Sequence, residues 1–341
     1  MSLRIGIVGA GANTRLRHLP GFQRLAGVEV VAVCNRTRAS AEKVASEFRI
    51  GEVYDDWKEL VHSPSVDAVC IGTWPYLHGP VTLEALAAGK HVLTEARMAV
   101  DLAEARRMHE AAGRSDRVAM VVPAPMFLES EAVVLEMVAD GFFGDVLEIH
   151  VRGLGGGYDP QAPIHWRQRR ELSGLNTMAL GILNETVRRY AGDERAVLAH
   201  GRIFTRERPD PQTGAPRVVD VPESLGVVAE MQSGATAVYH LSSVARLGGG
   251  PILEVHGTRG AFRLEGEEAW VAGPGEAQFR RLEIPPERQG GWQVEEDFAA
   301  AILRGRPVTR TSFADGVKYM AFTEAVDRSL RQGRRVELPL A

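Results

Sequence analysis

Short apolar runs alternate with segments of helical spacing in the first third of the chain. The apolar runs have the length of strands, and runs without polar residues are typical of parallel strands covered on both faces. These runs span residues 3–10, 28–35, 66–73, 91–96 and 118–124. The segments with helical spacing between them span residues 39–48, 78–89 and 101–113. Strands and helices in alternation predict βαβ units, and so a doubly wound parallel sheet.

The pattern changes after about residue 124. A predicted helix at 129–141 is followed by long strand-forming segments, two of which contain the turns "QSGA" and "GTRG", with glycine where a positive φ is favoured. The expected strands span residues 145–153, 198–206, 226–244, 252–266 and 277–285. Two helices, at about 294–304 and 313–332, and a terminal "RRVELPL" close the chain. This order predicts an α/β domain with a mostly antiparallel open sheet and helices on one face.

The length of the chain favours two domains. A chain of 341 residues exceeds the usual size of one compact core. Its hydrophobic share of 45% and charged share of 25% are ordinary for a globular protein. We therefore expect one domain at 1–123 and a second at 124–341, with the closing helices packing back on the first.

Charge, hydropathy and cysteine content exclude several classes of partner. A net charge of -4 argues against nucleic acid, because phosphate binding needs clustered lysine and arginine. No apolar run approaches the roughly 20 residues that cross a bilayer, and the glycine-rich "IGIVGAGA" is too short for a signal peptide. Cys34 and Cys70 lack the spacing of a metal site. We expect a cytoplasmic protein without a bound metal or a membrane partner.

A glycine turn follows the first predicted strand. In "GIVGAGANT", Gly9 and Gly11 stand where a dinucleotide-binding turn needs a tight bend and a close approach of the backbone to the pyrophosphate. Thr14 replaces the third glycine of the usual pattern, and we expect it to cap the following helix and to offer its hydroxyl to phosphate. The alternative is an ordinary strand-to-helix turn. The place at the start of a βαβ series favours a nucleotide site.

The end of the second predicted strand bears on the choice of nucleotide. An NAD site usually carries Asp or Glu there for the ribose 2′-hydroxyl, whereas an NADP site supplies a cation. This strand ends in "CNRTR", with Asn35, Arg36 and Thr37 but no carboxylate. NADP is therefore favoured, and NAD stays open because Arg36 and Arg38 can equally be solvated charges at the start of a helix.

These features together resemble the glucose-fructose oxidoreductase / inositol dehydrogenase family (Gfo/Idh/MocA) over nearly the whole chain. The resemblance rests on the order of the glycine loop, "VDAVCIGTWPYLH", "AGKHVLTEARMA", "DGFFGDVLEIHV", "HWR" at 165–167 and "GRRVEL". The second and third of these stand where the family has Thr-Pro-Asn-x-x-His and Glu-Lys-Pro. The resemblance implies a Rossmann domain, and a second domain whose open sheet often packs in homo-oligomers. It also implies hydride transfer between a nicotinamide and a sugar-like alcohol, with the substrate at the cleft beside the second sheet.

The resemblance also indicates the cofactor pocket. His78 matches the family histidine, and we expect it at a helix start in that pocket rather than in catalysis. Trp74 is expected to wall the nucleotide site, with core packing as the alternative. The residues expected to bind the cofactor are Gly9, Ala10, Gly11, Asn13, Thr14, Asn35, Arg36, Thr37, Thr73, Trp74, His78, Glu95 and Ala96.

The usual acid–base residues of the family are missing. Ala96 stands where the resemblance implies the lysine that assists loss of the substrate's hydroxyl proton. In the second domain, Ala179 replaces an aspartate and Leu183 a histidine, and Met126 stands near a commonly polar position. General acid–base assistance is typically worth roughly 10² to 10⁴ in rate. Another residue must carry the proton if the protein turns over.

Three residues are candidate catalytic substitutes. Arg97 can clamp an anionic group or stabilise an oxyanion, or it can simply pair with Glu95. Glu185 can take the proton, or it can pair with Arg188 or Arg189 at helical spacing. His165 follows the glycine-rich loop "GLGGGYDPQAP", which we expect to act as a mobile lid; a packed loop histidine is the alternative.

The sequence thus predicts a two-domain oxidoreductase that prefers NADP and acts on a sugar, a polyol or a related small carbonyl compound. The alternative is a nucleotide-binding protein of the same fold that has lost turnover and serves as a sensor or a partner subunit. Measuring the absorbance of reduced cofactor against a substrate panel would separate the two.

Overall fold

The computed structural model describes residues 2–340, which divide into two compact units. The first unit contains the residues up to Pro123 together with Gln293–Met320. The second contains Ala124–Trp292 and the residues from Ala321 onward. Helix α10 (Phe313–Gln332) therefore contributes its first residues to the first unit and the rest to the second.

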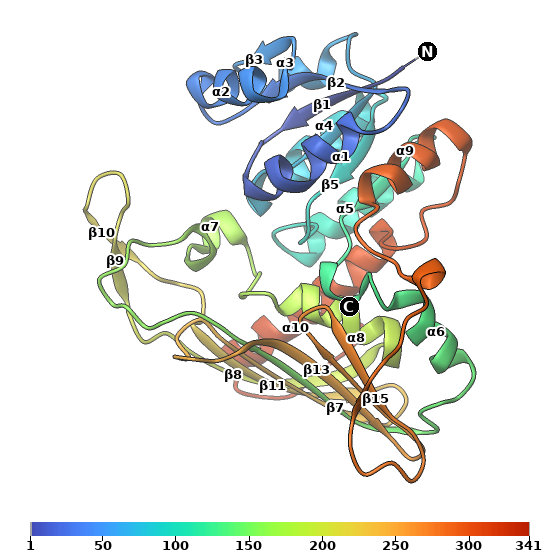
Figure 1. Cartoon of the computed structure of the whole chain (residues 1–341). Helices are drawn as coiled ribbons and strands as arrows, with labels where there is room; N and C mark the ends of the chain where they lie inside the picture. Colours follow the sequence, from blue (N-terminus) through green and yellow to red (C-terminus); the bar gives the residue numbers. More distant parts are fainter. Residues whose placement is uncertain (1, 341) are drawn as a thin grey trace. The chain divides into compact units, whose positions relative to one another are not determined.

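The first unit is built on a parallel sheet. Among the described residues it has six strands in the order β3-β2-β1-β4-β5-β6 (Figure 1). In chain order these are β1 (Leu3–Val8), β2 (Val28–Cys34), β3 (Glu52–Tyr54), β4 (Ala68–Ile71), β5 (His91–Thr94) and β6 (Ala119–Val121). The predicted doubly wound parallel sheet is confirmed. The short strand β3 was not predicted, because its three residues are only partly buried and lack an apolar run.

Side-chain caps define the starts of several helices in the first unit. Thr37 accepts a hydrogen bond from the Ser40 amide at the start of α2, and Asp101 does the same for the Glu104 amide at α5. The helices are η1 (Thr14–His18), α1 (Leu19–Gln23), α2 (Arg38–Phe48), α3 (Trp57–His62), η2 (Pro75–Leu77), α4 (His78–Ala87), α5 (Leu102–Gly113) and α9 (Val294–Arg304). Segment η1 is a π-helix, in which the Leu19 amide donates to the Thr14 carbonyl five residues earlier.

The second unit is built on a mostly antiparallel sheet. Within residues 2–340 this sheet has nine strands in the order β16-β15-β14-β13-β7-β12-β11-β8-β17, and β7 and β12 run parallel. The strands are β7 (Val146–Leu154), β8 (Glu194–Arg202), β11 (Ser224–Met231), β12 (Thr236–Ser242), β13 (Gly250–Gly257), β14 (Ala261–Glu265), β15 (Glu268–Ala272), β16 (Arg280–Arg281) and β17 (Val336–Glu337). A separate hairpin pairs β9 (Glu207–Pro209) with β10 (Pro216–Val218). The predicted open sheet is confirmed.

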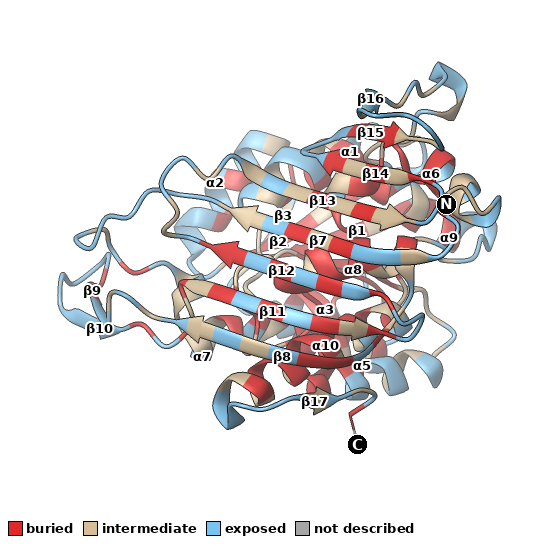
Figure 2. Ribbon diagram, turned by 90° about the horizontal axis from the view of Figure 1, so that it is seen from below, coloured by how far each residue is buried: buried red, intermediate tan, exposed pale blue. Residues whose placement is uncertain are grey.

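Helices cover one face of this sheet. Helix α8 (Leu180–Ala191) packs on β7 (Figure 1). The ring of Phe322 in α10 lies 5.2 Å from that of Tyr239 in β12, with the two ring planes tilted by 46°. The other helices of the unit are η3 (Pro125–Phe127), α6 (Glu131–Ala139), η4 (Trp166–Gln168), α7 (Arg170–Ser173) and η5 (Pro286–Arg288). Exposed residues alternate with buried ones along β8, β11 and β12 (Figure 2), so the exposed residues lie on the face that the helices leave uncovered. One face of the sheet is thus open, as predicted.

Two strand predictions need correction. The expected strand at 277–285 contains only Arg280–Arg281 in the structure. Both residues are exposed at the edge of the sheet, and Pro285 has no amide to donate to a neighbouring strand. The strand expected at 198–206 starts earlier and ends at Arg202. It ends there because the next amides bond to a carboxylate instead of to a neighbouring strand: Phe204 and Thr205 both donate to Glu223.

Candidate active site

The glycine turn packs against the loop that follows β4. Gly9 has a φ of 87°, and a Cβ there would lie 2.6 Å from Thr73 Cγ2. A Cβ on Gly72 would lie 2.0 Å from Thr14 Oγ1. Glycine is therefore required on both sides of this approach. At Gly11 a Cβ would meet only the Gly72 carbonyl, at 3.4 Å, so this glycine keeps the surface of the turn free of a side chain.

The structure corrects the predicted role of Thr14. Its side chain is buried, and its hydroxyl donates to the Gly9 carbonyl at 3.2 Å. The N-cap position belongs to Asn13, which makes no side-chain cap. Thr14 therefore braces the turn from inside instead of presenting its hydroxyl to phosphate.

The end of β2 holds the turn and carries a cation. Asn35 accepts from the Ala10 amide at 2.7 Å, so its side chain fixes the conformation of the turn. The guanidinium of Arg36 lies 5.4 Å from the centre of the Trp74 ring, a cation–π contact. Arg38 instead binds Glu42 and Asp55, each at 2.8 Å. The structure thus separates the two arginines: Arg36 lies on the aromatic ring beside the turn, and Arg38 lies in surface ion pairs.

His78 connects two loops at the carboxyl edge of the parallel sheet. It is buried at the start of α4, with Nδ1 at 2.8 Å from the Arg97 carbonyl and Nε2 at 2.9 Å from the Thr73 carbonyl. Burial lowers the pKa of His78, although both carbonyl contacts oppose that shift. These contacts tie the loop after β4 to the loop after β5, which suits the predicted pocket role better than proton transfer.

The loop after β5 begins with Glu95. Its Oε1 accepts from the Asn13 side chain and also contacts His18, so this oxygen binds partners other than Arg97. Ala96 follows, with no group that can carry a proton. Arg97 is only 2% exposed, and the Ala96–Arg97 peptide bond is cis.

His18 is a residue of this site that the sequence analysis missed. It is fully buried between Glu95 and Glu295, and these two contacts raise its pKa to about 9 against the opposing effect of burial. Glu295 lies 277 positions away in α9, so no local motif could pair the two. The one local signal is a histidine directly before the apolar "LPGF".

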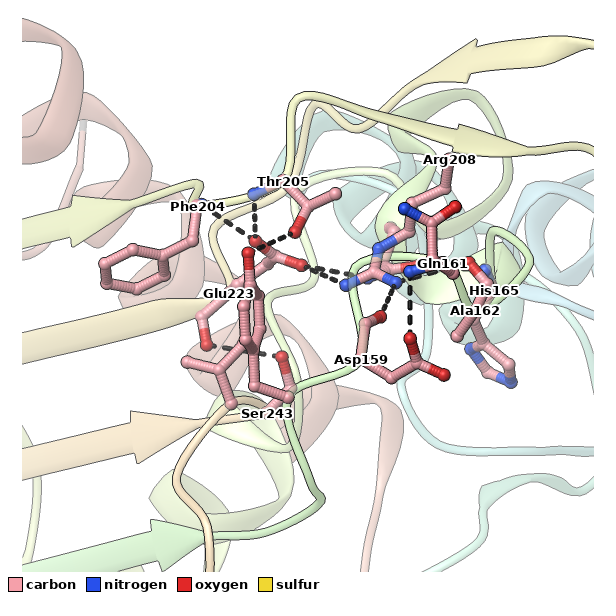
Figure 3. A network of polar contacts seen from close by, with 12 residues as sticks. Asp159, Gln161, Ala162, His165, Phe204, Thr205, Arg208, Glu223 and Ser243 are labelled. Atoms are coloured by element: carbon pink, nitrogen blue, oxygen red, sulfur yellow. Dashed lines mark hydrogen bonds and ion pairs between the residues drawn. The ribbon is translucent and has the colours of Figure 1, made fainter.

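In the second unit, His165 lies at the end of the glycine-rich loop (Figure 3). It is exposed, and its Nδ1 accepts from the Arg167 amide at 3.3 Å, which caps η4. Partial desolvation lowers the pKa of His165, and the charge of Arg167 adds to this effect. An exposed imidazole with a lowered pKa is chemically able to accept a proton near neutral pH.

The loop before His165 is anchored by a buried ion pair (Figure 3). Arg208 donates to the carbonyls of Asp159 and Ala162 at 2.6 and 3.2 Å, and to Glu223 Oε1 at 3.0 Å. The other oxygen of Glu223 accepts the two amides that follow β8. The second half of this loop is thus held through two of its carbonyls by a buried cation, and the mobile lid stays a prediction.

Glu185 lies inside a packed ionic cluster of the second unit. It is buried in α8, accepts from the Ala124 amide at 3.4 Å and lies 3.9 Å from an Arg189 nitrogen. Arg189 makes its shorter contact, 2.8 Å, with Glu131. Helical spacing allows Glu185 to pair with Arg188 or Arg189, and in the structure it lies within ion-pair distance of Arg189. Leu183, at the expected histidine position, is buried in the same helix.

The described chain supplies neither a metal centre nor a membrane span. Among residues 2–340, no three His, Cys, Asp or Glu side chains gather in a group that could hold a metal ion. No helix within these residues has the length and apolar character needed to cross a membrane.

Comparison with known proteins gives a consistent assignment. A family model described as an oxidoreductase family with an NAD-binding Rossmann fold matches residues 3–122, and the GFO/IDH/MocA C-terminal domain matches residues 132–263. A 1,5-anhydro-D-fructose reductase of Ensifer adhaerens is 26% identical over 348 residues, covering 98% of this chain and 98% of the relative. A levoglucosan dehydrogenase of Pseudarthrobacter phenanthrenivorans is 24% identical over 388 residues, covering 99% and 98%. The crystal structure of an NAD-binding oxidoreductase from Klebsiella pneumoniae, 26% identical, superimposes with a TM-score of 0.87 over 100% of both chains.

Proposed function

Because the chain belongs to the Gfo/Idh/MocA family of oxidoreductases, we propose that it transfers hydride between NADP and a sugar, a polyol or a related small carbonyl compound. The observation that carries this proposal is the turn at Gly9 and Gly11, whose surface carries no side chain at Gly11. Hydrogen bonds from the Thr14 hydroxyl to the Gly9 carbonyl and from the Ala10 amide to Asn35 hold the turn in place. The amides of the first helical turn have no partners within the helix, so they can bind a pyrophosphate. When bound, the nicotinamide supplies the hydride acceptor or donor.

Turnover distinguishes this proposal from its alternative. We expect reduced cofactor to appear or disappear, followed by its absorbance, with at least one member of a panel of polyols, sugars and keto sugars. Binding without turnover across the panel would instead indicate a sensor or partner subunit. The similar proteins named as a dehydrogenase and a reductase favour the enzyme.

For the cofactor we propose a preference for NADP carried by Arg36. Its guanidinium stacks on Trp74 beside the turn, and no carboxylate follows β2 to bind a ribose 2′-hydroxyl.

Arg36→Ala is expected to weaken NADPH binding about 10- to 100-fold with little change for NADH, the range typical of one charge-assisted contact. Calorimetric titration of both nucleotides measures the ratio. Arg38→Ala is the matched control, because Arg38 already binds Glu42 and Asp55. Equal losses for both nucleotides in Arg36→Ala would contradict the assignment.

For the proton step we propose Glu185 or His165, since Ala96 cannot serve. If one of them carries the proton, Glu185→Gln or His165→Ala should lower kcat about 10² to 10⁴-fold while nucleotide affinity is retained. Steady-state kinetics and nucleotide titration on each variant measure the two effects. Full turnover in both variants would show that neither Glu185 nor His165 carries the proton. We further propose that Arg97 helps to hold an anionic or oxyanionic group.

We also propose that copies of the chain associate through the open face of the second sheet. Leu198, Val228 and Val238 are exposed and lie directly opposite one another in the register of β8, β11 and β12. These three strands are neighbours in the sheet (Figure 2). A continuous exposed apolar strip of this kind is typical of an interaction surface. Light scattering should give the mass of a multimer.

Since Cys34 and Cys70 are both buried free thiols, we propose a reducing, cytoplasmic location.

A further inference from the structure

A buried histidine lies next to the nucleotide turn, and the function proposed above makes no use of it. His18 is 0% exposed and ends η1. Its Nδ1 lies 2.5 Å from Glu295 Oε1, and its Nε2 lies 3.1 Å from Glu95 Oε1. The two carboxylates come from different elements, α9 and the end of β5.

This geometry fixes the charge of the ring. A carboxylate only accepts hydrogen bonds, and a neutral imidazole has one N–H. Carboxylates at both nitrogens therefore require an imidazolium, which donates on both sides. Burial opposes that charge, but the contacts with Glu295 and Glu95 outweigh it and raise the pKa of His18 to about 9.

The same oxygen of Glu95 connects His18 to the start of the helix. Glu95 Oε1 accepts from Asn13 Nδ2 at 2.5 Å, and Asn13 is two residues beyond Gly11. Residues five apart diverge on an α-helix but come closer on a π-helix, whose hydrogen bonds join i and i+5. The π-helical turn thus lets Asn13 and His18 reach one carboxylate oxygen.

The structure also leaves space for the second carboxylate. A Cβ on Gly21 of α1 would lie 2.5 Å from Glu295 Oε2. Glycine at this position lets the Glu295 carboxylate come close to the helix that carries His18. The cluster of Asn13, His18, Glu95 and Glu295 therefore joins η1, β5 and α9 in closely packed surroundings.

We propose that His18, as an imidazolium between Glu95 and Glu295, is a positioning residue of the cofactor site that fixes Asn13 and the helix start behind the glycine turn. The inference rests on the proposed function, because only a nucleotide on this turn makes the positioning useful. Loss of the charge removes an N–H donor from one of the two carboxylates and weakens the attraction that fixes Glu95, so Asn13 is held less firmly. Nucleotide affinity then falls.

No other titratable group near His18 accounts for a change in charge between neutral pH and about pH 9. The groups concerned are its two carboxylate partners, Glu95 on the β5 loop and Glu295 on α9, and, beside these, Cys70 on β4 and His78 on α4. Burial raises the pKa of the Cys70 thiol well above its usual value and lowers that of His78, so both stay neutral in the neutral range. Burial would raise the pKa of Glu95, but contact with His18 leaves it below its usual value. The folded-state pKa of His18 exceeds its ordinary value of 6.5, so its contribution is complete below about pH 6.5 and is lost as pH rises through about 9.

The experiment measures the Kd of NADPH for the full chain from about pH 7 to about pH 10. We expect the wild-type Kd to stay level and then to rise about tenfold as pH passes about 9. His18→Gln should bind about tenfold more weakly at neutral pH and show no such step. His62→Gln, at an exposed histidine bound to Glu84, is the matched control and should behave as wild type.

A second variant keeps the inference testable if His18→Gln does not fold. Glu295→Gln removes one charged partner, so the step should move to lower pH. A level wild-type Kd across the range, wild-type affinity in His18→Gln, or an unmoved step in Glu295→Gln would each overturn the positioning role while leaving nucleotide binding intact. Failure of the wild type to bind any nucleotide would instead overturn the proposed function, and this inference with it.

Discussion

Gly11→Val is expected to weaken nucleotide binding more than about 100-fold, equivalent to roughly 2.7 kcal/mol, while the chain remains folded. A Cβ at this position meets only the Gly72 carbonyl at 3.4 Å, so the turn itself tolerates the substitution. The branched methyl groups of valine would nevertheless fill the surface on which a pyrophosphate must approach the backbone.

Calorimetric titration with NADPH and NADH measures this loss, and thermal unfolding shows whether the fold persists. Gly51→Val is the matched control, since Gly51 lies in the same unit with open space around its Cβ position. Retained affinity in Gly11→Val would mean that the nucleotide does not use this turn. A large drop in the unfolding midpoint would contradict the claim that Gly11 serves binding and not folding.

Arg208→Ala is expected to destabilise the second unit by roughly 3–5 kcal/mol, the usual cost of breaking a buried ion pair. The Arg208 side chain is 6% exposed and that of Glu223 only 1%, so the remaining carboxylate has no access to water. Arg208 also binds two carbonyls of the loop before His165, so the loop loses its anchor at the same time.

Urea unfolding followed by circular dichroism measures the change in the free energy of unfolding. Arg217→Ala provides the control on the neighbouring strand β10. Its side chain is 53% exposed in a pair with Asp210, so its loss should cost at most about 1 kcal/mol. Equal effects of the two variants would show that the Arg208–Glu223 pair is no anchor. Arg208→Ala/Glu223→Gln should recover part of the loss, because the double variant leaves no unpaired buried charge.

The parts of the fold that the sequence predicted are those with a strong local signal. The apolar runs predict most of the parallel strands, because strands such as β1 and β4 are buried on both faces. The two glycine turns gave the hairpins of β11–β12 and β13–β14. Strand β3 and the β9–β10 hairpin escaped prediction, because they are short and lack apolar runs.

The candidate site was predictable only in part, for a different physical reason. Gly9, Gly11 and Asn35 follow from chain order, since each lies at the carboxyl end of an adjacent parallel strand. The sequence predicts that the Thr14 hydroxyl faces phosphate, whereas in the structure it donates to the Gly9 carbonyl. His18 and Glu295 pair across 277 positions, and Arg208 reaches back 49 residues to Asp159. Such contacts depend on tertiary packing, which no local pattern encodes.

A crystal structure of the chain with NADPH tests the central claim most directly. The account predicts pyrophosphate oxygens within about 3 Å of the backbone amides of the helical turn that follows Gly11, with the Arg36 guanidinium at the 2′-phosphate. A nucleotide bound elsewhere, or a side chain occupying the space over Gly11, would contradict it.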